Sequence, residues 1–328
     1  MRFLVVGVGS IGQRHARNLR ALGHDVAAFD TDATRLEQVG AALGIATVPV
    51  LAGGASLKPD GVLVCTPPNE HVPVALEALA WGSHLFIEKP LAPTTAAVGR
   101  LLEEAEARGH RILVGSNLRF FKPLRRVKDL VEEGRIGRVL AVRAQIGFYL
   151  PSWKPGTDYR QTYRGHAAEG GGILLDAIHE FDYLRWLFGE VCEVVGTVER
   201  LSTLQIDAED YAEVTLRFVS GVIAQLHLDY LQRSYRRNCE VIGERGVIVW
   251  DYIERRVTLH TEEPDRWQGF GEPIDYNHNE MFVEEMAHFV RCLEGQEQPV
   301  VDGRDALRTL RVIEAAKASA QGQGRVRL

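Results

Sequence analysis

Three glycines in the pattern G-x-G-x-x-G near the N-terminus constrain the fold of this chain more than any other stretch. A short apolar run at residues 3–6 precedes them and predicts a strand buried on both faces. Residues 13–22 then repeat apolar side chains at helical spacing, and a second apolar run, residues 26–29, ends at Asp30. This order of strand, glycine-rich turn, helix, strand and terminal acid is the one that a dinucleotide-binding βαβ unit requires.

Each glycine of the pattern has a physical role in such a unit. Gly7 permits the tight turn that leaves the strand, and Gly9 exposes backbone that a pyrophosphate can approach. Gly12 lets the helix pack closely on the strand. The helix begins near Ser10 and Ile11, where unpaired N–H groups and the positive end of the helix dipole attract phosphates. The alternative is a doubly wound domain whose first turn holds no ligand.

Asp30 decides between the two nicotinamide dinucleotides. Its carboxylate can accept hydrogen bonds from both hydroxyls of an adenosine ribose, and it would repel a 2′-phosphate. The next residues, Thr31 and Asp32, offer no cation to hold such a phosphate. The sequence therefore predicts NAD as the cofactor and disfavours NADP.

Composition limits the classes of protein and partner. The chain has 328 residues, 45% hydrophobic and 25% charged, which is ordinary for a globular protein of two domains. A net charge of -6 without a basic block argues against nucleic acid as a partner. No signal peptide and no stretch of about 18 apolar residues is present, so we expect a cytoplasmic protein without membrane contact. The four cysteines are far apart without a C-x-x-C pair, which predicts reduced thiols and neither disulfides nor a metal site.

Strands and helices alternate through residues 1–120, which predicts a doubly wound parallel sheet and an NAD-binding domain with these bounds. Buried strands are predicted at 61–65 and 84–87, and each ends in a polar segment. Such strand ends lie at the carboxyl edge of the sheet, where doubly wound folds bind ligands. Both segments are therefore candidates for the functional site.

These two segments have distinct chemistry. In the first, Asn69 is expected to cap a helix whose first turn contains His71, and a capped helix start is the simplest role for that histidine. In the second, Pro90 keeps Lys89 out of helical backbone angles and so fixes the direction of its ammonium group. Lys89 could equally be a solvated lysine or an ion-pair partner of Glu88.

Four motifs follow one another along the chain: Gly7-x-Gly9-x-x-Gly12, Thr66-Pro67-Pro68-x-x-His71, Glu88-Lys89-Pro90 and Arg119-Phe120. In this order they resemble those of the glucose–fructose oxidoreductase, inositol dehydrogenase and rhizopine catabolism (Gfo/Idh/MocA) family. The Glu-Lys-Pro triplet after a strand is the most specific of them. The resemblance extends over nearly the whole chain, but it does not point to one substrate.

The resemblance implies an NAD-dependent oxidoreductase with a Rossmann domain followed by an α+β domain. It places Lys89 beside the nicotinamide and the reacting hydroxyl, where an ammonium group could stabilise a developing alkoxide or move a proton. It further implies that the cofactor is lined by Thr66, Pro67, Asn69, His71, Glu88 and Asn117.

Residues 121–328 are predicted to form the second domain, which binds substrate and forms oligomers. A long strand over residues 139–149 is followed by a polar, aromatic loop. Aromatic and arginine side chains suit polar sugars, but such a loop could equally be a surface excursion or a subunit contact. The candidate substrate residues in and before this loop are Arg119, Trp153, Arg160 and Tyr163.

The stretch 170–189 begins with three glycines and predicts a helix. Asp176 and His179, three residues apart on one face, could pair an orienting acid with a proton-carrying imidazole and could both contact substrate. A buried helix with one satisfied histidine is the alternative. The resemblance favours catalysis by His179, but it places the acid four residues earlier, where this chain has Leu175, so Asp182 is a second candidate partner.

Successive segments between residues 191 and 260 alternate apolar and polar side chains and predict a mostly antiparallel sheet. Helices on one side of it would complete an α+β domain with an open sheet face. The resemblance implies that this face pairs with another subunit in a homodimer or homotetramer. Closing helices are predicted at 279–293 and 303–320, the last packing on the first domain, and residues 321–328 are expected to be poorly ordered.

Three functions are open from the sequence. The first is hydride transfer between NAD and a CH–OH carbon of a sugar, cyclic polyol or nucleotide-linked sugar, with Lys89 holding the oxygen and His179 the proton. The second keeps NAD bound and uses transient oxidation to epimerise or cleave a glycoside. The third is a non-catalytic NAD-binding sensor, which the fold alone allows but the presence of both Lys89 and His179 argues against.

Overall fold

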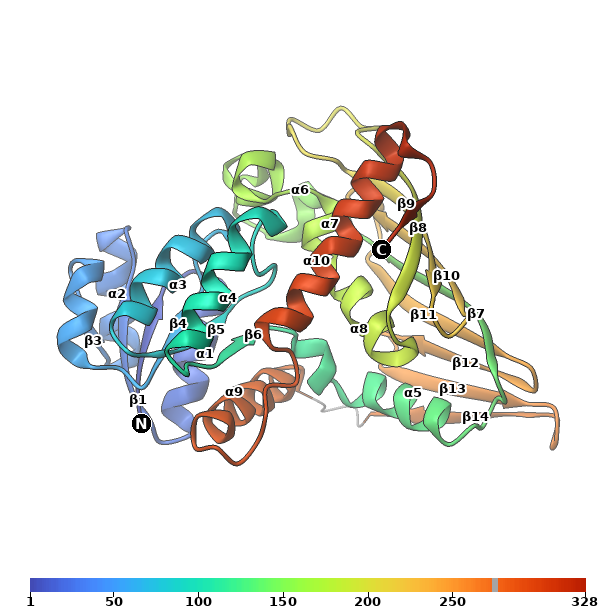
Figure 1. The fold of residues 1–328 in the computed structure, drawn as a ribbon, viewed down its shortest axis with the longest axis horizontal. Helices are drawn as coiled ribbons and strands as arrows, with labels where there is room; N and C mark the ends of the chain where they lie inside the picture. Colours follow the sequence, from blue (N-terminus) through green and yellow to red (C-terminus); the bar gives the residue numbers. More distant parts are fainter. Residues whose placement is uncertain (273–276) are drawn as a thin grey trace. The chain divides into compact units, whose positions relative to one another are not determined.

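The structure is a computed structural model that describes residues 1–272 and 277–328 (Figure 1). The chain folds into two compact units, each built around a sheet of its own. The first unit combines Met1–Phe120 with His278–Arg308, and the second combines Phe121–Asn277 with Thr309–Leu328.

The first unit is built on a six-stranded sheet of order β3-β2-β1-β4-β5-β6, in which all neighbours are parallel. The chain moves outward from β1 to β3 and then returns to place β4 on the other side of β1. This topology is that of a doubly wound dinucleotide-binding fold and confirms the predicted Rossmann sheet. The strands are β1 (Arg2–Val6), β2 (Asp25–Phe29), β3 (Ala46–Thr47), β4 (Gly61–Val64), β5 (His84–Ile87) and β6 (Ile112–Val114).

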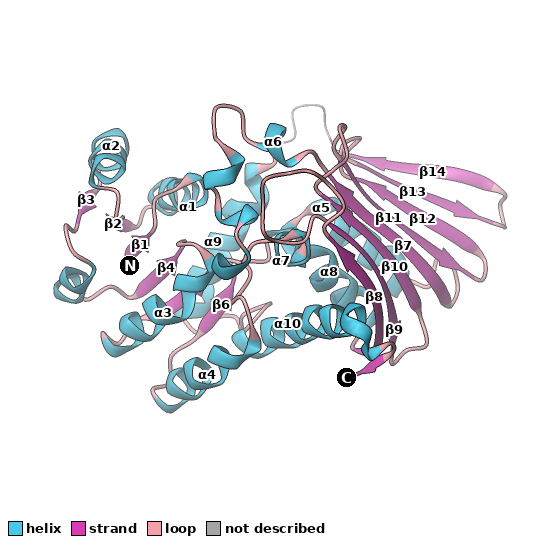
Figure 2. Cartoon of the chain, turned by 90° about the horizontal axis from the view of Figure 1, so that it is seen from above, coloured by secondary structure: helices cyan, strands magenta, loops and turns pink. Residues whose placement is uncertain are grey.

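Helices cover both faces of this sheet (Figure 2). Apolar side chains of α1, α2 and α9 share one core with the strands on one face, and α3 packs against α4, β4 and β5 on the other. Each helix supplies a buried apolar stripe, as the helical spacing of the sequence predicts. The helices are α1 (Ser10–Ala21), α2 (Ala33–Leu43), α3 (His71–Ala80), α4 (Val98–Ala107) and α9 (Asn279–Leu293).

The position of α9 changes the predicted division of the chain. The sequence assigned everything after residue 120 to the second domain, whereas residues 278–308 group with the first unit. The reason is packing: Met286, Phe289 and Cys292 of α9 are fully buried in the core that contains β1 and α1. Helix α10 (Gly303–Ala318) is divided between the two units: residues 303–308 group with the first unit and the rest of the helix with the second.

The second unit is built on a nine-stranded sheet of order β14-β13-β12-β11-β7-β10-β9-β8-β15. Only the β7–β10 pair is parallel, so the predicted mostly antiparallel sheet is confirmed. The strands are β7 (Val139–Gly147), β8 (Val191–Glu199), β9 (Tyr211–Phe218), β10 (Ile223–Asp229), β11 (Arg236–Gly243), β12 (Gly246–Asp251), β13 (Arg256–Thr261), β14 (Arg266–Gly271) and β15 (Val326–Arg327).

One face of this sheet is buried against helices, and its other face is polar. In β9, for example, Ala212, Val214, Leu216 and Phe218 are buried, while Glu213 and Arg217 between them are exposed. No helix of the described residues covers the polar face (Figure 1). The helices of this unit are α5 (Lys122–Glu132), α6 (Leu150–Trp153), α7 (Ile173–Asp176) and α8 (Ile178–Phe188).

On the polar face, His227 lies between two carboxylates. Its Nδ1 atom is 2.6 Å from Glu213 Oε1, and its Nε2 atom is 2.9 Å from Asp229 Oδ2. The pKa of His227 is raised to about 9, mainly by the hydrogen bond to Asp229. Partial burial lowers this pKa, whereas the contact with Glu213 raises it further. His227 is therefore an imidazolium at neutral pH.

His227→Gln is expected to flatten the pH dependence of folding stability between pH 6.5 and about 9. Because the folded pKa lies above the unfolded value, the stabilisation by His227 is complete below pH 6.5 and is lost as the pH rises through about 9. Urea unfolding at a series of pH values checks this. Equal pH dependence of the wild type and the variant would contradict it.

Two local predictions are wrong, and one strand was missed. Asn69 does not cap α3, because Pro68–Glu70 form a tighter 3₁₀ turn and the Asn69 amide donates to Glu70 Oε1 at 3.2 Å. The C-terminal segment contains strand β15, which pairs with β8 and orders residues expected to be loose. Strand β14 was not predicted, since its residues are mostly exposed and lack an apolar face.

In the described ranges, no helix has both the length and the apolar character for crossing a bilayer.

Candidate functional site

The polar segments that follow the strands of the first unit lie together at the carboxyl edge of its sheet. Strands β1, β4, β5 and β6 are parallel, so the residues that follow them gather at their carboxyl ends. Doubly wound folds bind their ligands at this edge. The residues that follow these strands are Gly7, Cys65 and Thr66, Glu88 and Lys89, and Gly115.

Steric contacts separate the roles of the three glycines in the first turn. Gly7 has a φ of +88°, and a Cβ there would lie 2.7 Å from the carbonyl oxygen of Cys65. A Cβ on Gly12 would lie 1.9 Å from the carbonyl oxygen of Gly7, so α1 could not approach β1. A Cβ on Gly9 would meet nothing within 4 Å. Packing therefore requires Gly7 and Gly12, whereas Gly9 faces open space.

The surroundings of Gly9 fit the phosphates of a dinucleotide. Helix α1 begins at Ser10, and no side chain of the described residues caps this end, so its first N–H groups can reach phosphate oxygens. Thr66 adjoins Gly7 of the same turn, and its Oγ1 atom is buried without a hydrogen-bond partner among the described residues. Buried hydroxyls are normally satisfied, so a bound ligand would complete this site. The turn, α1 and Thr66 thus suit NAD.

Asp30 follows β2 and has its carboxylate fixed by the backbone. Its Oδ2 accepts a hydrogen bond from Val8 N–H at 2.8 Å, and its Oδ1 accepts one from Asp32 N–H at 2.9 Å. The sequence showed no cation in the next two residues, yet Arg35 Nη1 lies 3.1 Å from Asp30 Oδ1. The reason is that α2 begins at Ala33, so its first turn carries Arg35 back to the strand end.

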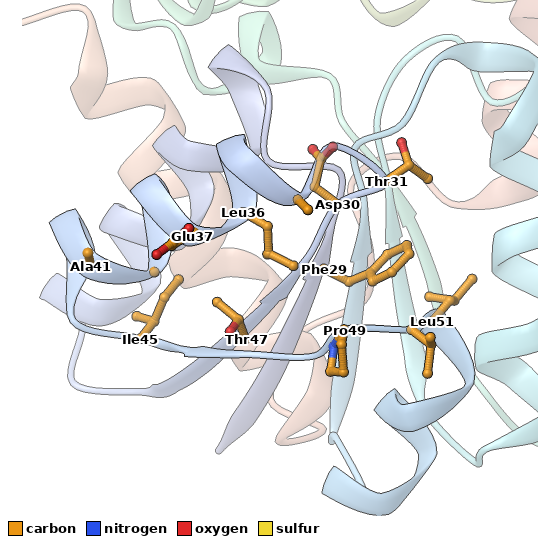
Figure 3. Close-up of a pocket in the computed structure, with 13 residues that line it drawn as sticks. Phe29, Asp30, Thr31, Leu36, Glu37, Ala41, Ile45, Thr47, Pro49 and Leu51 are labelled. Carbon is orange, nitrogen blue, oxygen red and sulfur yellow. The ribbon is translucent and has the colours of Figure 1, made fainter.

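A pocket of about 680 Å³ opens beside Asp30 and Thr31 (Figure 3). It is lined by α2 and by the chain that follows α2 through β3, and most of its lining is apolar. Glu37 and Asp30 are its acidic residues. An apolar ring could pack in this pocket while an attached hydroxyl group reaches the carboxylate of Asp30.

His71 connects two of the loops at the sheet edge. Its Nδ1 atom is 2.8 Å from the carbonyl oxygen of Pro90, and its Nε2 atom is 2.9 Å from that of Thr66. Burial lowers the pKa of His71, and the two carbonyl oxygens only partly oppose this. The neutral imidazole therefore donates to one carbonyl at a time. Its contacts hold the loops after β4 and β5 together.

Glu88 connects the cofactor helix to Lys89. Its Oε1 lies 2.7 Å from Nε2 of His15 on α1, and its Oε2 accepts the Lys89 backbone N–H at 3.2 Å. Burial alone would raise the pKa of Glu88, but the hydrogen bond and charge of His15, together with the charge of Lys89, lower it below its usual range. Glu88 is thus an anion beside Lys89. The Lys89–Pro90 peptide is cis.

Asn117 and Arg119 lie in the turn after β6 and are held inside the first unit. The Asn117 amide donates to Met281 Sδ at 3.2 Å. Arg119 is 6% exposed, pairs with Asp305 at 2.7 Å and donates to the carbonyl oxygen of Val300 at 3.2 Å. These contacts anchor the turn. Contact of Asn117 with the cofactor, and of Arg119 with substrate, stays a prediction.

In the second unit, the predicted helix around Asp176 is divided into α7 and α8. Ala177, with φ -89° and ψ 19°, separates them, so Asp176 and His179 do not share one face of a continuous helix as predicted. Asp176 is the last residue of α7. Its carboxylate accepts hydrogen bonds from Arg164 Nε at 2.7 Å and from the Tyr230 hydroxyl at 3.3 Å. The charge-assisted contact with Arg164 holds the Asp176 carboxylate in place at the end of α7.

His179 lies in the first turn of α8 and is 9% exposed. The next residue, Glu180, is fully buried, and its carboxylate accepts hydrogen bonds from Arg237 Nε at 2.7 Å and Nη2 at 3.0 Å. Burial is the largest single effect and lowers the pKa of Arg237, but the charge and hydrogen bond of Glu180, together with Tyr235, outweigh it and raise that pKa. This ion pair joins α8 to β11 and fixes the backbone that carries His179.

Glu180→Leu is expected to destabilise the second unit by about 3–5 kcal/mol, because it leaves the Arg237 guanidinium buried without its partner. Urea unfolding followed by tryptophan fluorescence measures this, since Trp250 is fully buried in the same unit. The double variant Glu180→Leu/Arg237→Met removes both charges and is expected to recover most of the loss. A single variant as stable as the wild type would refute the role of this pair.

The predicted substrate residues of the second unit are in different surroundings. Trp153 is 41% exposed, and its ring centroid lies 4.3 Å from that of Phe148. Arg160 pairs with Asp158 at 2.8 Å on the surface. The Tyr163 hydroxyl lies 3.5 Å from the carboxylate of Asp176, so these two predicted residues come together. A role in substrate binding stays a prediction for all of them.

Sequence reasoning missed His15 and Arg35. A signal for His15 was present, because it lies on the same helical face as Gly12 and Leu19, and a polar residue on a core face needs a partner. No short-range pattern indicates Arg35. Arg35 lies five residues after Asp30, and its side chain reaches the carboxylate of Asp30 because the first turn of α2 points back toward the end of β2.

Comparison with known families agrees with this arrangement. Residues 1–116 match a family described as "Oxidoreductase family, NAD-binding Rossmann fold". Residues 124–249 match the "GFO/IDH/MocA C-terminal domain". The two matches fall on the two sheets in turn, so both halves of the chain point to the same class of protein.

Individual relatives and solved structures are similar over the whole length. The myo-inositol 2-dehydrogenase of Thermotoga maritima is 30% identical, with 100% of this chain and 98% of that protein covered. The inositol 2-dehydrogenase of Rhizobium meliloti is 28% identical over 97% of this chain and 96% of that protein. The WlbA dehydrogenase of Bordetella pertussis, solved with NADH and UDP-GlcNAcA, is 26% identical, with a TM-score of 0.86 and coverage of 100% and 98%.

Proposed function

This chain belongs to the Gfo/Idh/MocA family of NAD-binding oxidoreductases, and from that premise we propose that it oxidises a polyhydroxylated ring. The substrate class is a sugar, cyclic polyol or nucleotide-linked sugar. Relatives named for inositol and a neighbour solved with UDP-GlcNAcA support this class. Bound NAD would accept the hydride. Side chains of this chain would bind the reacting hydroxyl oxygen and remove its proton.

Lys89 is the residue we propose for the reacting oxygen. Its ammonium group would donate a hydrogen bond to the hydroxyl that is oxidised and stabilise negative charge as it develops on that oxygen. The observation that carries the proposal is the connection from α1 through His15 and Glu88 to the Lys89 backbone. This chain of contacts ties Lys89 to the helix whose N-terminus suits the cofactor phosphates.

His179 is the residue we propose for the proton. An imidazole can accept the hydroxyl proton during oxidation and return it in the reverse direction. Asp176 is held by Arg164 and Tyr230, so we assign it the role of positioning the neighbouring backbone and hydroxyl groups. Trp153 and Tyr163 are proposed substrate contacts, as aromatic and hydroxyl groups suit a sugar ring.

A substrate screen tests this function. Purified protein is incubated with NAD, and separately with NADP, and a panel of polyols, aldoses, sugar acids and nucleotide sugars. Formation of NADH with one substrate class, lost in Lys89→Ala, is the expected result. Tight NADH binding with no turnover on any member would count against a dehydrogenase and in favour of a sensor. Product formed without net NADH would indicate that the cofactor stays bound, is reduced to NADH and is then re-oxidised to NAD within the same turnover.

We propose a homodimer or homotetramer that forms through the polar face of the second sheet. That face has no helix cover among the described residues, and it exposes Val195, which is paired with Thr215 of β9, at 41%. We also propose a reducing, cytoplasmic location, because all four cysteines are free thiols. Light scattering of the purified protein would test the oligomer, and a monomer at micromolar concentration would contradict it.

A further inference from the structure

The carboxylate of Asp30 is covered by a cation that belongs to the next helix. Arg35 Nη1 lies 3.1 Å and 3.3 Å from the two carboxylate oxygens of Asp30. Its Nη2 lies 3.1 Å from Asp32 Oδ2. The side chain of Arg35 is 45% exposed, whereas that of Asp30 is only 5% exposed. One guanidinium therefore bridges two acids at the sheet edge and remains accessible to solvent.

Arg35 is not needed to hold Asp30 in place. The backbone N–H groups of Val8 and Asp32 each donate to one oxygen of that carboxylate, at 2.8 Å and 2.9 Å. The contribution of Arg35 is thus mainly charge. Two carboxylates and one guanidinium leave one net negative charge in this cluster, and the pocket alongside adds Glu37. A dianionic 2′-phosphate is repelled there even though a cation is present.

Neutralising Asp30 would reverse this balance. Arg35 would keep its Nη2 contact with Asp32, so its guanidinium would stay near its present position. Its Nη1 atom would then face the place that the Asp30 carboxylate now occupies. A guanidinium whose N–H groups form a fixed fork is well suited to bind a phosphate.

We infer that Arg35 is a masked ligand for a 2′-phosphate, and that this chain selects NAD through the negative charge of Asp30 rather than through the lack of a cation. The inference rests on the proposed function, in that it places the adenosine ribose of the cofactor at Asp30. It adds a specificity-determining residue to that site. It also predicts that one substitution is enough to admit NADP, and that the gain depends on Arg35.

A four-protein comparison of cofactor binding tests this. The dissociation constants for NADH and NADPH are measured by calorimetry on the full chain for the wild type, Asp30→Ser, Arg35→Ala and the double variant. Asp30→Ser is expected to bind NADPH about tenfold more tightly than the wild type does and NADH about tenfold less tightly. Arg35→Ala alone is expected to gain nothing for NADPH, and the double variant is expected to lose the gain of Asp30→Ser.

Two results would overturn the inference: no gain for NADPH in Asp30→Ser, or a gain that persists in the double variant. Arg100→Ala is the matched control, since Arg100 is an exposed, ion-paired arginine on α4, and both constants are expected to stay unchanged. If Asp30→Ser fails to fold, Asp30→Asn removes the same charge at nearly constant size and is expected to show the same dependence on Arg35.

Cofactor binding is measured without a substrate, so a failure of the inference about Arg35 can be distinguished from a failure of the proposed reaction. A wild type that binds NADH but turns over no substrate would weaken only the proposed reaction. Adenosine 2′,5′-bisphosphate, compared with adenosine 5′-monophosphate, isolates the 2′-phosphate from the rest of the cofactor. In Asp30→Ser the bisphosphate is expected to bind more tightly than the monophosphate. Equal binding of the two would overturn the inference.

Discussion

Lys89→Ala lowers kcat by about 100-fold or more, and leaves the dissociation constant for NADH within about threefold of the wild type. This expectation follows from its position. Lys89 follows β5 at the edge that carries the glycine turn, and its backbone N–H is held by Glu88, which is in turn held by His15. The side chain is lost without disturbing these backbone contacts. Steady-state kinetics and NADH titration measure the two effects separately.

Lys128→Ala is the matched control for this experiment. Lys128 lies on α5, pairs with Glu132 and has no place in the proposed site, so neither kcat nor NADH binding is expected to change. A Lys89→Ala protein that keeps more than about a tenth of the wild-type kcat would show that the ammonium group does not stabilise the reacting oxygen. Equal losses in both lysine variants would point to a general effect of charge.

Gly12→Ala is expected to destabilise the first unit by about 3 kcal/mol or more, because its Cβ would lie 1.9 Å from the carbonyl oxygen of Gly7. A backbone oxygen has no rotamer with which to move aside, so α1 must shift away from β1. Gly9→Ala is the matched substitution at a position where the Cβ meets nothing within 4 Å. It is expected to unfold at nearly the wild-type temperature and yet bind NADH about tenfold or more weakly.

Thermal unfolding and NADH titration of both variants distinguish packing from ligand binding. The two glycines are three residues apart in one motif, so the pair also controls for local sequence. If Gly9→Ala bound NADH as well as the wild type, the open space at Gly9 would not be the phosphate site. A Gly12→Ala protein with unchanged stability would contradict the close approach of α1 to β1.

The first sheet could be predicted from sequence because its signals are local. The apolar runs of β1, β2, β4 and β5 are bounded by glycines, prolines or acids, and their order fixes the topology through right-handed crossovers. The second sheet was predicted from alternation, as in β9. Strand β14 has no such alternation, and two-residue β15 is held only by pairing with β8, so neither gives a local signal.

The parts of the site that sequence did not predict depend on contacts between distant residues. Glu88 is held by His15, 73 residues away, and Asp176 by Tyr230, 54 residues away. The break at Ala177 is another case, since the helical pattern of apolar residues continues through it, whereas α7 ends at Asp176 and α8 begins at Ile178. Residue types and spacing therefore located the candidate groups, but their partners required the fold.

The proposed hydride transfer is tested most directly by following the hydrogen itself. The substrate class that gives turnover is deuterated at its CH–OH carbons and mixed with protein and unlabelled NAD, and the nicotinamide is recovered for NMR. Direct transfer predicts one deuterium at the nicotinamide C4 for each product formed, and label that appears about 100-fold or more slowly with Lys89→Ala. Product that appears while C4 carries no deuterium, or no turnover with any polyol, sugar or nucleotide sugar, would contradict assignment of this chain as a hydride-transferring dehydrogenase.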